Sequence, residues 1–164
     1  MTHLTRQQQL LGLAGWLVAC FIVAAIGSAA SIQAGPFYAQ LIRPEWAPPP
    51  AVFGPVWTML YTLMAISAWL VWRVDGFAGA KPALLMFLAQ LLPNALWSWL
   101  FFAWNLGGPA FFDILLMLAM IMATQVLFWR ISRLATVLLI PYLLWVSFAA
   151  ALNFSLWQLN PQLL

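Results

Sequence analysis

Two amides and two aromatic rings recur at helical spacing inside one long apolar segment. They are separated by four, three and four residues and are Gln90, Asn94, Trp97 and Phe101. In an α-helix this spacing places all of them on one face. Such a face suits a pocket that holds a flat, mostly apolar ligand with few polar contacts. The alternative is that both amides hydrogen-bond to neighbouring helices and hold a bundle together.

A proline-rich stretch, residues 43–61, precedes a second aromatic pair. Proline fixes φ and disfavours helix in the residue before it, so residues 43–50 are predicted to be an extended connection. From Pro55 the pattern becomes helical, and Trp57 and Tyr61 then share one face. This arrangement predicts a rigid lid above an aromatic wall.

A third aromatic stripe lies near the end of the chain. Trp145 is followed by Ala149 and then by Leu152 or Asn153 on the same side of a helix. A large ring one turn from a small residue leaves a hollow beside an aromatic surface. A single stripe of this kind is more often packing or lipid contact. Three stripes from three helices, with a proline-braced connection, favour a ligand cavity.

One acid, Asp113, falls inside a long apolar run. An acid within a membrane segment can serve as a proton relay or as the counter-ion of a substrate. Its place near the start of that run favours a capping or interfacial role instead.

Other residue types exclude most familiar chemistry. Cys20 is the only cysteine and His3 the only histidine, so neither a disulfide nor a metal site is expected. The chain has no serine–histidine–acid set, no paired carboxylates and no glycine-rich phosphate loop, which argues against hydrolysis and phosphoryl transfer. No cofactor is expected. The few basic residues are dispersed, so nucleic-acid binding is excluded as well.

Composition determines which elements carry these residues. The chain has 164 residues, 66% hydrophobic and 5% charged, whereas a soluble domain has about 25% charged residues. It is therefore predicted to be a single all-α domain embedded in a lipid bilayer. Five apolar runs approach the about 20 residues that cross a membrane, and they give predicted spans at residues 10–30, 53–73, 82–103, 110–130 and 134–157. The only long connection is the first, in which residues 35–41 are predicted to form a short interfacial helix.

Basic residues indicate the orientation of these spans. Five of them fall on the side of the N-terminus, namely Arg6, Arg73, Lys81, Arg130 and Arg133, and only Arg43 falls on the other. Because basic residues favour the cytoplasmic side, the N-terminus is predicted to be cytoplasmic and the C-terminus to lie across the membrane. The proline-rich connection then also lies on the far side.

Several motifs together resemble the translocator protein family, also called tryptophan-rich sensory protein (TspO/MBR). The resemblance covers nearly the whole chain. It rests on Gly27–Ser28, Tyr38 followed by RPEWAPP (43–49), VFGPVWTMLY (52–61), NALW (94–97) with Phe101 and Phe102, Asp113, and PYLLW…ALNF (141–154).

The resemblance implies a bundle of five transmembrane helices, commonly a homodimer, with a cavity under the first loop. It implies ligands such as porphyrins (protoporphyrin IX, haem), sterols and benzodiazepine-type compounds. Transferred position by position, the ligand-binding set comprises Tyr38, Trp46, Pro48, Trp57, Tyr61, Asn94, Trp97, Trp145, Ala149 and Leu152. Some bacterial members are reported to degrade porphyrin in light, which makes Trp57 and Trp145 the residues expected to carry such photochemistry.

The sequence departs from the family pattern at a few positions. Phe37 stands where tryptophan is common, Trp99 replaces a proline, and Ala29 or Ala30 occupies a region where some members have arginine. Phe154 and Gln158 replace the tyrosine and arginine of the animal sterol-recognition motif, which is itself a weak pattern. These last changes argue against high-affinity cholesterol binding.

Three functions remain in consideration. The first is a receptor or sensor that binds porphyrins. Transport of the bound porphyrin is an optional addition to this function. The second is light-dependent porphyrin degradation. The third is a dimeric regulatory scaffold, for which Gly12, Gly15, Ala19, Ala25 and Ala29 give the first span a small-residue face.

Overall fold

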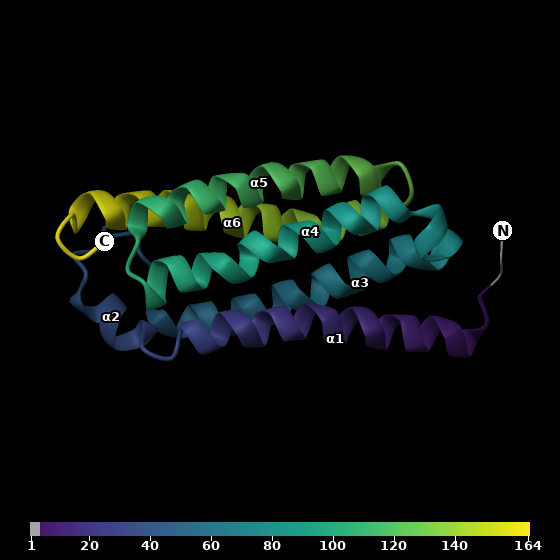
Figure 1. Cartoon of the computed structure of the whole chain (residues 1–164), viewed down its shortest axis with the longest axis horizontal. Helices are drawn as coiled ribbons and strands as arrows, with labels where there is room; N and C mark the ends of the chain where they lie inside the picture. Colours follow the sequence, from purple (N-terminus) through teal and green to yellow (C-terminus); the bar gives the residue numbers. More distant parts are fainter. Residues whose placement is uncertain (1–3) are drawn as a thin grey trace.

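Long apolar helices make up most of the computed structural model, which describes residues 4–164 (Figure 1). His3 lies outside the described residues. The elements are α1 Arg6–Ala30, α2 Ala34–Gln40, the 3₁₀ turn η1 Pro50–Val52, α3 Phe53–Gly79, α4 Lys81–Ser98, the π turn η2 Trp99–Ala103, α5 Gly107–Trp129 and α6 Arg133–Leu159. Within the described part of the chain, five helices are long and apolar enough to span a membrane. The predicted all-α membrane bundle is confirmed.

Side-chain caps fix where two of the long helices begin. At α1, Gln8 N donates to Thr5 Oγ1 (3.2 Å) and Thr5 N donates to Gln8 Oε1 (2.9 Å). This reciprocal pair is a capping box, and it satisfies two backbone donors at the helix start. At α6, Ser132 Oγ accepts from Ala135 N (3.3 Å). Both caps precede apolar runs, so polar side chains mark the ends of the membrane segments.

The first connection has the predicted form. Residues 35–41 were expected to contain a short helix, and α2 (Ala34–Gln40) is that helix. Beyond it, the chain up to Pro49 is extended apart from a turn at residues 45–46. Pro55 falls in the first turn of α3, where its missing N–H costs no hydrogen bond.

Two boundaries differ from the sequence prediction by five residues or more. The expected turn at residues 74–81 is helical as far as Gly79, and Gly76 adopts φ +65°, which glycine tolerates without a steric cost. The third span was predicted at residues 82–103, but α4 ends at Ser98 and the last five residues, Trp99–Ala103, form the π turn η2. This wider turn accommodates Phe101, which is buried and stacked on Trp97 (centroids 5.5 Å apart). Hydropathy alone predicts neither the extra helical turns of α3 nor the π turn after α4, because these residues are mostly apolar in any helical form.

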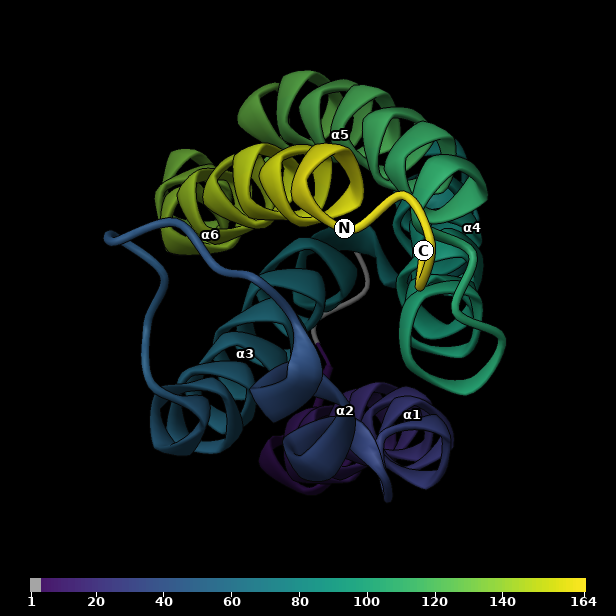
Figure 2. The ribbon, with the colours of Figure 1, turned by 90° about the vertical axis from the view of Figure 1, so that its left-hand side faces the viewer.

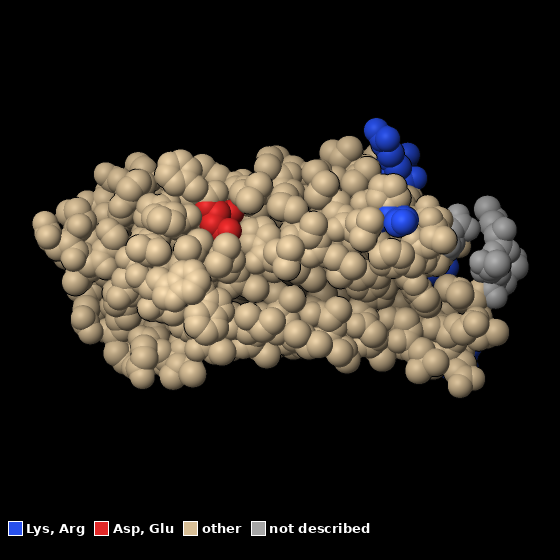
Figure 3. Space-filling view, viewed as in Figure 1, with Lys and Arg blue, Asp and Glu red and all other residues tan. Residues whose placement is uncertain are grey.

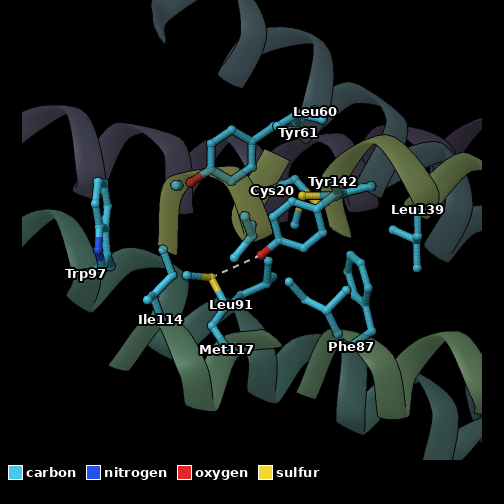
Figure 4. Packing of buried hydrophobic residues seen from close by; sticks show 14 of the residues in the cluster. Cys20, Leu60, Tyr61, Phe87, Leu91, Trp97, Ile114, Met117, Leu139 and Tyr142 are labelled. Atoms are coloured by element: carbon cyan, nitrogen blue, oxygen red, sulfur yellow. Dashed lines mark hydrogen bonds between the residues drawn. The ribbon is translucent and has the colours of Figure 1, made fainter. Parts of the chain in front are cut away.

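The five long helices form a closed ring. Contacts join α1 to α3, α3 to α6, α6 to α5, α5 to α4 and α4 back to α1. Figure 2 shows this ring from the end at which α2 lies. Each helix turns one side toward the centre, where Tyr142, Phe87 and Met64 are fully buried. Figure 4 shows the packing around Tyr142, whose ring lies among side chains from several helices.

The N- and C-termini lie at opposite ends of the bundle (Figure 1), as an odd number of spans requires. Figure 3 shows that the basic groups on the visible face gather at the end where the N-terminus lies. The long sides of the bundle carry exposed apolar residues, such as Leu92, Phe112 and Leu144. These sides are suited to contact lipid chains.

Candidate ligand cavity

A cavity of about 330 Å³ lies at the α2 end of the bundle. Its walls come from the second half of α1, from α2, from η1 and the first turns of α3, and from the end of α4 with η2. Five residues of the expected ligand-binding set line it: Tyr38, Trp57, Tyr61, Asn94 and Trp97. The structure therefore brings together predicted residues from α3, from α4 and from α2 in the first connection.

The two tryptophan walls are held by different contacts. On α3, the rings of Trp57 and Tyr61 lie 5.6 Å apart at an angle of 33°. On α4, Trp97 Nε1 donates to Asn153 Oδ1 (3.0 Å), and Asn153 Nδ2 donates to the Gly107 carbonyl (2.9 Å). The indole of Trp97 is therefore fixed by α6, and through α6 by the start of α5. A fixed aromatic face binds a flat ring with little loss of side-chain freedom.

A chain of hydrogen bonds closes the floor of the cavity. Tyr61 Oη donates to Asn94 Oδ1, and Asn94 Nδ2 donates to Tyr142 Oη (2.9 Å). Tyr142 Oη in turn lies 3.0 Å from Gln90 Oε1, its acceptor, and also near Met117 Sδ, the contact drawn in Figure 4. Gln90 therefore hydrogen-bonds to a neighbouring helix, α6, as the packing alternative predicted. Asn94 has both predicted roles, because it lines the cavity and also hydrogen-bonds to two other helices.

The first connection forms the roof. Tyr38 Oη donates to the Pro48 carbonyl (3.2 Å), and the Arg43 guanidinium lies over the Tyr38 ring at 5.0 Å. Burial raises the pKa of the Tyr38 phenol, and the Arg43 charge opposes this only in part. Tyr38 therefore stays protonated at neutral pH and keeps its role as a donor. Tyr38 also packs against Phe53 at the start of α3 (5.8 Å between centroids).

The other residues of the expected set lie outside the cavity lining. Trp46 is 50% exposed and packs on Phe148 (5.7 Å), and Pro48 contributes only its carbonyl to the Tyr38 hydrogen bond. Trp145 lies behind Phe53, 6.0 Å from that ring, and its buried Nε1 has no hydrogen-bond partner among the described residues.

Ala149 and Leu152 are buried in α6 and likewise do not line the cavity. The reason is the order of helices in the ring, in which α3 separates α1 from α6. The rings of Phe53 and Trp57 therefore stand between the cavity and Trp145.

Sequence reasoning missed the contribution of α1. Phe21, Ala24, Ser28 and Ser31 line the cavity, with Gly27 beside them. Their spacing of three, four and three residues is a helical face, so the signal was present in the sequence. It was hidden because small and apolar residues on a membrane helix equally predict helix packing.

Asp113 does not cap α5. The helix begins at Gly107, its N-cap position is Leu106 without a side-chain hydrogen bond, and its first turn holds no acidic residue. Asp113 lies in the second turn, and its Oδ2 is buried with no hydrogen-bond partner among the described residues. Across residues 4–164 no cluster of three or more His, Cys, Asp or Glu side chains is placed to hold a metal ion.

Comparison with known proteins relates this architecture to one family. The sequence profile of the TspO/MBR family matches residues 16–158. Protein CrtK of Rhodobacter capsulatus is 40% identical over 151 residues, which cover 89% of this chain and 91% of that protein. Tryptophan-rich protein TspO of Chlorobaculum tepidum is 37% identical over 159 residues (94% and 99%). The human translocator protein is 40% identical over 126 residues (76% and 75%).

These matches agree with the motifs and with the five apolar helices, so the protein is an integral multi-pass membrane protein. The chain belongs to the TspO/MBR family.

Proposed function

We propose that the protein is a membrane receptor or sensor that binds porphyrins, such as protoporphyrin IX or haem, in the cavity under the first connection. The observation that carries the proposal is the cavity itself, which has a volume of about 330 Å³ and has Trp57 and Trp97 in its walls. Small-molecule sites range from about 300 to 1,000 Å³ and are mostly apolar with a few polar groups. Here the polar groups are Tyr61 and Asn94 at the floor and serine and threonine hydroxyls along the sides.

The chemistry of a porphyrin matches this distribution. Its flat ring presents a large apolar face, which stacks favourably on aromatic side chains. Its carboxylates need a cation or water, and Arg43 stands at the roof end of the cavity, over Tyr38. We therefore expect the ring to lie between Trp57 and Trp97, with its carboxylates toward the first connection. Family membership supports the same ligand class.

The direct test is titration of the purified protein with protoporphyrin IX, followed by porphyrin absorbance and by tryptophan quenching. Trp57→Ala and Trp97→Ala should each raise Kd about tenfold, which is about 1.4 kcal/mol of binding energy. Trp129→Ala is the matched control, because Trp129 is 51% exposed at the end of α5 and does not line the cavity. Equal affinity in wild type, Trp57→Ala and Trp97→Ala would exclude the cavity as the porphyrin site.

A second candidate is light-dependent breakdown of the bound porphyrin, favoured by the indole of Trp57 in the cavity wall. Illumination of the aerobic porphyrin complex should then give new bilin-like absorbance that is absent in the dark. Trp57→Phe should abolish this product, whereas Trp145→Phe should retain it because Trp145 lies behind Phe53. Unchanged spectra in illuminated wild-type samples would exclude this activity and leave the binding function.

We also infer that the protein is a homodimer with its N-terminus in the cytoplasm. Family membership supports the dimer, and α1 presents exposed small residues at Gly15, Ala25 and Ala29. The basic residues at the N-terminal end of the bundle support the orientation.

A further inference from the structure

The cavity has one open side, which lies between α1 and α3. Six of its lining residues are exposed. Four of them come from the two helices: Phe21 and Ser28 of α1, and Gly54 and Thr58 of α3. The other two, Gly35 of α2 and Pro50 of η1, belong to the ends of the first connection next to these helices. Phe21 is 40% exposed, and a Cβ added at Gly54 would meet no atom within 4 Å. The space beside Gly54 is therefore empty rather than filled by a neighbouring side chain.

The other sides of the cavity are closed. Between α1 and α4, a Cβ added at Gly27 would lie 3.3 Å from Ser98 Oγ, so these two helices are in close contact. Toward α6, Phe53 packs against Trp145 and Trp57 packs against Tyr142. At the floor, the Tyr61–Asn94 hydrogen bond separates the cavity from the core.

The roof is tied to the C-terminal end of the bundle. Asn160, just after α6, accepts from Ile42 N (2.8 Å) and donates to the Ile42 carbonyl (2.9 Å). Its amide also donates to the Leu156 carbonyl (2.8 Å). Asn160 is 5% exposed, so these bonds are shielded from competing water. This pairing fixes the connection next to Arg43, and Tyr38 fixes it again through Pro48.

The open side is bordered by residues of two candidate membrane spans. Gly54 and Thr58 belong to the candidate span Pro50–Val74, and Phe21 and Ser28 belong to Arg6–Ala30. The Thr58 hydroxyl donates to the Gly54 carbonyl of its own helix (3.0 Å). A threonine satisfied in this way can face hydrocarbon without an unpaired donor. The edge of the opening is therefore compatible with lipid chains.

We propose that ligands reach the cavity sideways from the bilayer, through the opening between α1 and α3, while Asn160 holds the roof in place. This inference rests on the proposed ligand-binding function and narrows the ligand class to molecules that dissolve in the membrane before they bind. An apolar flat ring partitions into lipid, and its concentration beside the opening then exceeds its concentration in water.

The first experiment measures association and dissociation rates of protoporphyrin IX with the protein in lipid nanodiscs. Gly54→Trp places a ring in the opening, and Ala24→Phe narrows it from the α1 side, since Ala24 also lines the cavity. Each should slow both association and dissociation by about tenfold, because a blocked path hinders entry and exit alike, whereas damage to the bound state would speed dissociation. Met59→Trp is the control, because Met59 is 50% exposed on α3 and does not line the cavity.

The roof is tested in the same assay. Asn160→Ala removes the bonds to Ile42 and should leave the association rate within about twofold of wild type. Faster association in Asn160→Ala, together with wild-type rates in Gly54→Trp and Ala24→Phe, would overturn the proposal in favour of access through the roof. Equal slowing by Met59→Trp would also overturn it, since the effect would then be general.

A second readout requires no ligand, so its failure is distinct from failure of the porphyrin proposal. A trifluoroethyl label on Ser98→Cys, with Cys20→Ala to remove the native thiol, reports from the cavity wall opposite the opening. Dissolved oxygen, which concentrates in the bilayer, should broaden its fluorine signal, and Gly54→Trp should reduce this broadening. A water-soluble nickel chelate should have little effect compared with the same label on Glu45→Cys, in the exposed connection. Strong broadening by the chelate at Ser98→Cys would show a cavity open to water and overturn the proposal.

Discussion

Asn94 shows how one side chain serves both packing and recognition. Its amide oxygen accepts from Tyr61 and its nitrogen donates to Tyr142 (2.9 Å), while the same residue lines the cavity. Buried polar groups in a membrane bundle are stabilising only when they are paired. The cavity floor is therefore rigid because its polar atoms are already bonded to three helices. Such a floor leaves few positions free to bond a ligand, which favours ligands with large apolar faces.

The hydroxyl of Tyr142 is the residue-scale test of this network. Tyr142→Phe removes the group that joins Asn94 to Gln90 in a fully buried position. Partners left unpaired in such a site cost about 1–3 kcal/mol, so the free energy of unfolding should fall by about this amount. Reversible unfolding in mixed micelles, or the thermal midpoint, measures the change.

Tyr38→Phe is the matched control, because it removes one hydroxyl from a partly buried bond to the Pro48 carbonyl. Its cost should be about 1 kcal/mol or less. A loss of stability in Tyr142→Phe no larger than that in Tyr38→Phe would contradict a stabilising central network.

At the scale of elements, α1 illustrates why small residues alone do not reveal a helix's partner. Gly12 faces inward, and a Cβ added there would lie 2.1 Å from the Trp72 ring of α3. Trp69 Nε1 also donates to the Gln9 carbonyl (2.9 Å), so two tryptophans fasten α3 to the start of α1. Gly15, one turn further, is exposed and meets no atom within 4 Å. The helices α1 and α3 are therefore in close contact near Gly12 and lie further apart at the cavity.

Gly12→Ala should therefore destabilise the bundle, since the Trp72 ring must leave its position. Overpacking of this kind costs about 1–3 kcal/mol. Gly15→Ala adds the same methyl group to the same helix without a clash, and should be neutral or stabilising because alanine favours helix. The thermal midpoints of the two variants in one detergent provide the comparison. A similar midpoint for both would show that α1 and α3 are not in close contact at Gly12.

At the scale of the whole molecule, the charge distribution distinguishes the two ends of the bundle. Arg6, Arg73, Lys81, Arg130 and Arg133 lie toward the end that holds the N-terminus, and Arg43 lies in the connection at the other end. Cation–π contacts fix two of these side chains beside tryptophans: Arg73 over Trp69 (4.8 Å) and Arg133 over Trp129 (5.3 Å). Paired basic and aromatic residues are typical of a membrane interface.

The orientation is testable with fusions to the C-terminus in a bacterial host. Alkaline phosphatase, which becomes active only outside the cytoplasm, should be active at this position, and green fluorescent protein should be dark. The same reporters inserted after Arg130, between α5 and α6, should behave in the opposite way because that connection lies at the other end of the bundle. A fluorescent C-terminal fusion would reverse the proposed orientation.

The homodimer is testable by cross-linking in native membranes with a short lipid-soluble reagent. A band at twice the mass of the chain should appear and should not depend on expression level. Val18→Arg places a charge on the exposed side of α1, where Val18 is 59% exposed. This change should reduce the band if α1 forms the interface. Detection of monomer alone, with a known dimer cross-linked in the same sample, would contradict the homodimer.

The sequence by itself determined the fold class, the short helix in the first connection and the membrane setting. These depend on composition, on hydrophobic runs and on proline, which act locally along the chain. The sequence also indicated five ligand-binding candidates that line the cavity: Tyr38, Trp57, Tyr61, Asn94 and Trp97. Helical spacing determines which residues share a face, and that property is local too.

Only the tertiary structure decided which faces meet. Trp145, Ala149 and Leu152 share a face of α6, but α3 stands between that helix and the cavity. The cavity wall is completed instead by the face of α1 that carries Phe21 and Ser28. In a membrane the lipid-facing and inward sides of a helix are both mostly apolar, so hydropathy alone does not identify the inward side. Close packing and hydrogen bonds between helices set the order in the ring, and that order left an opening between α1 and α3.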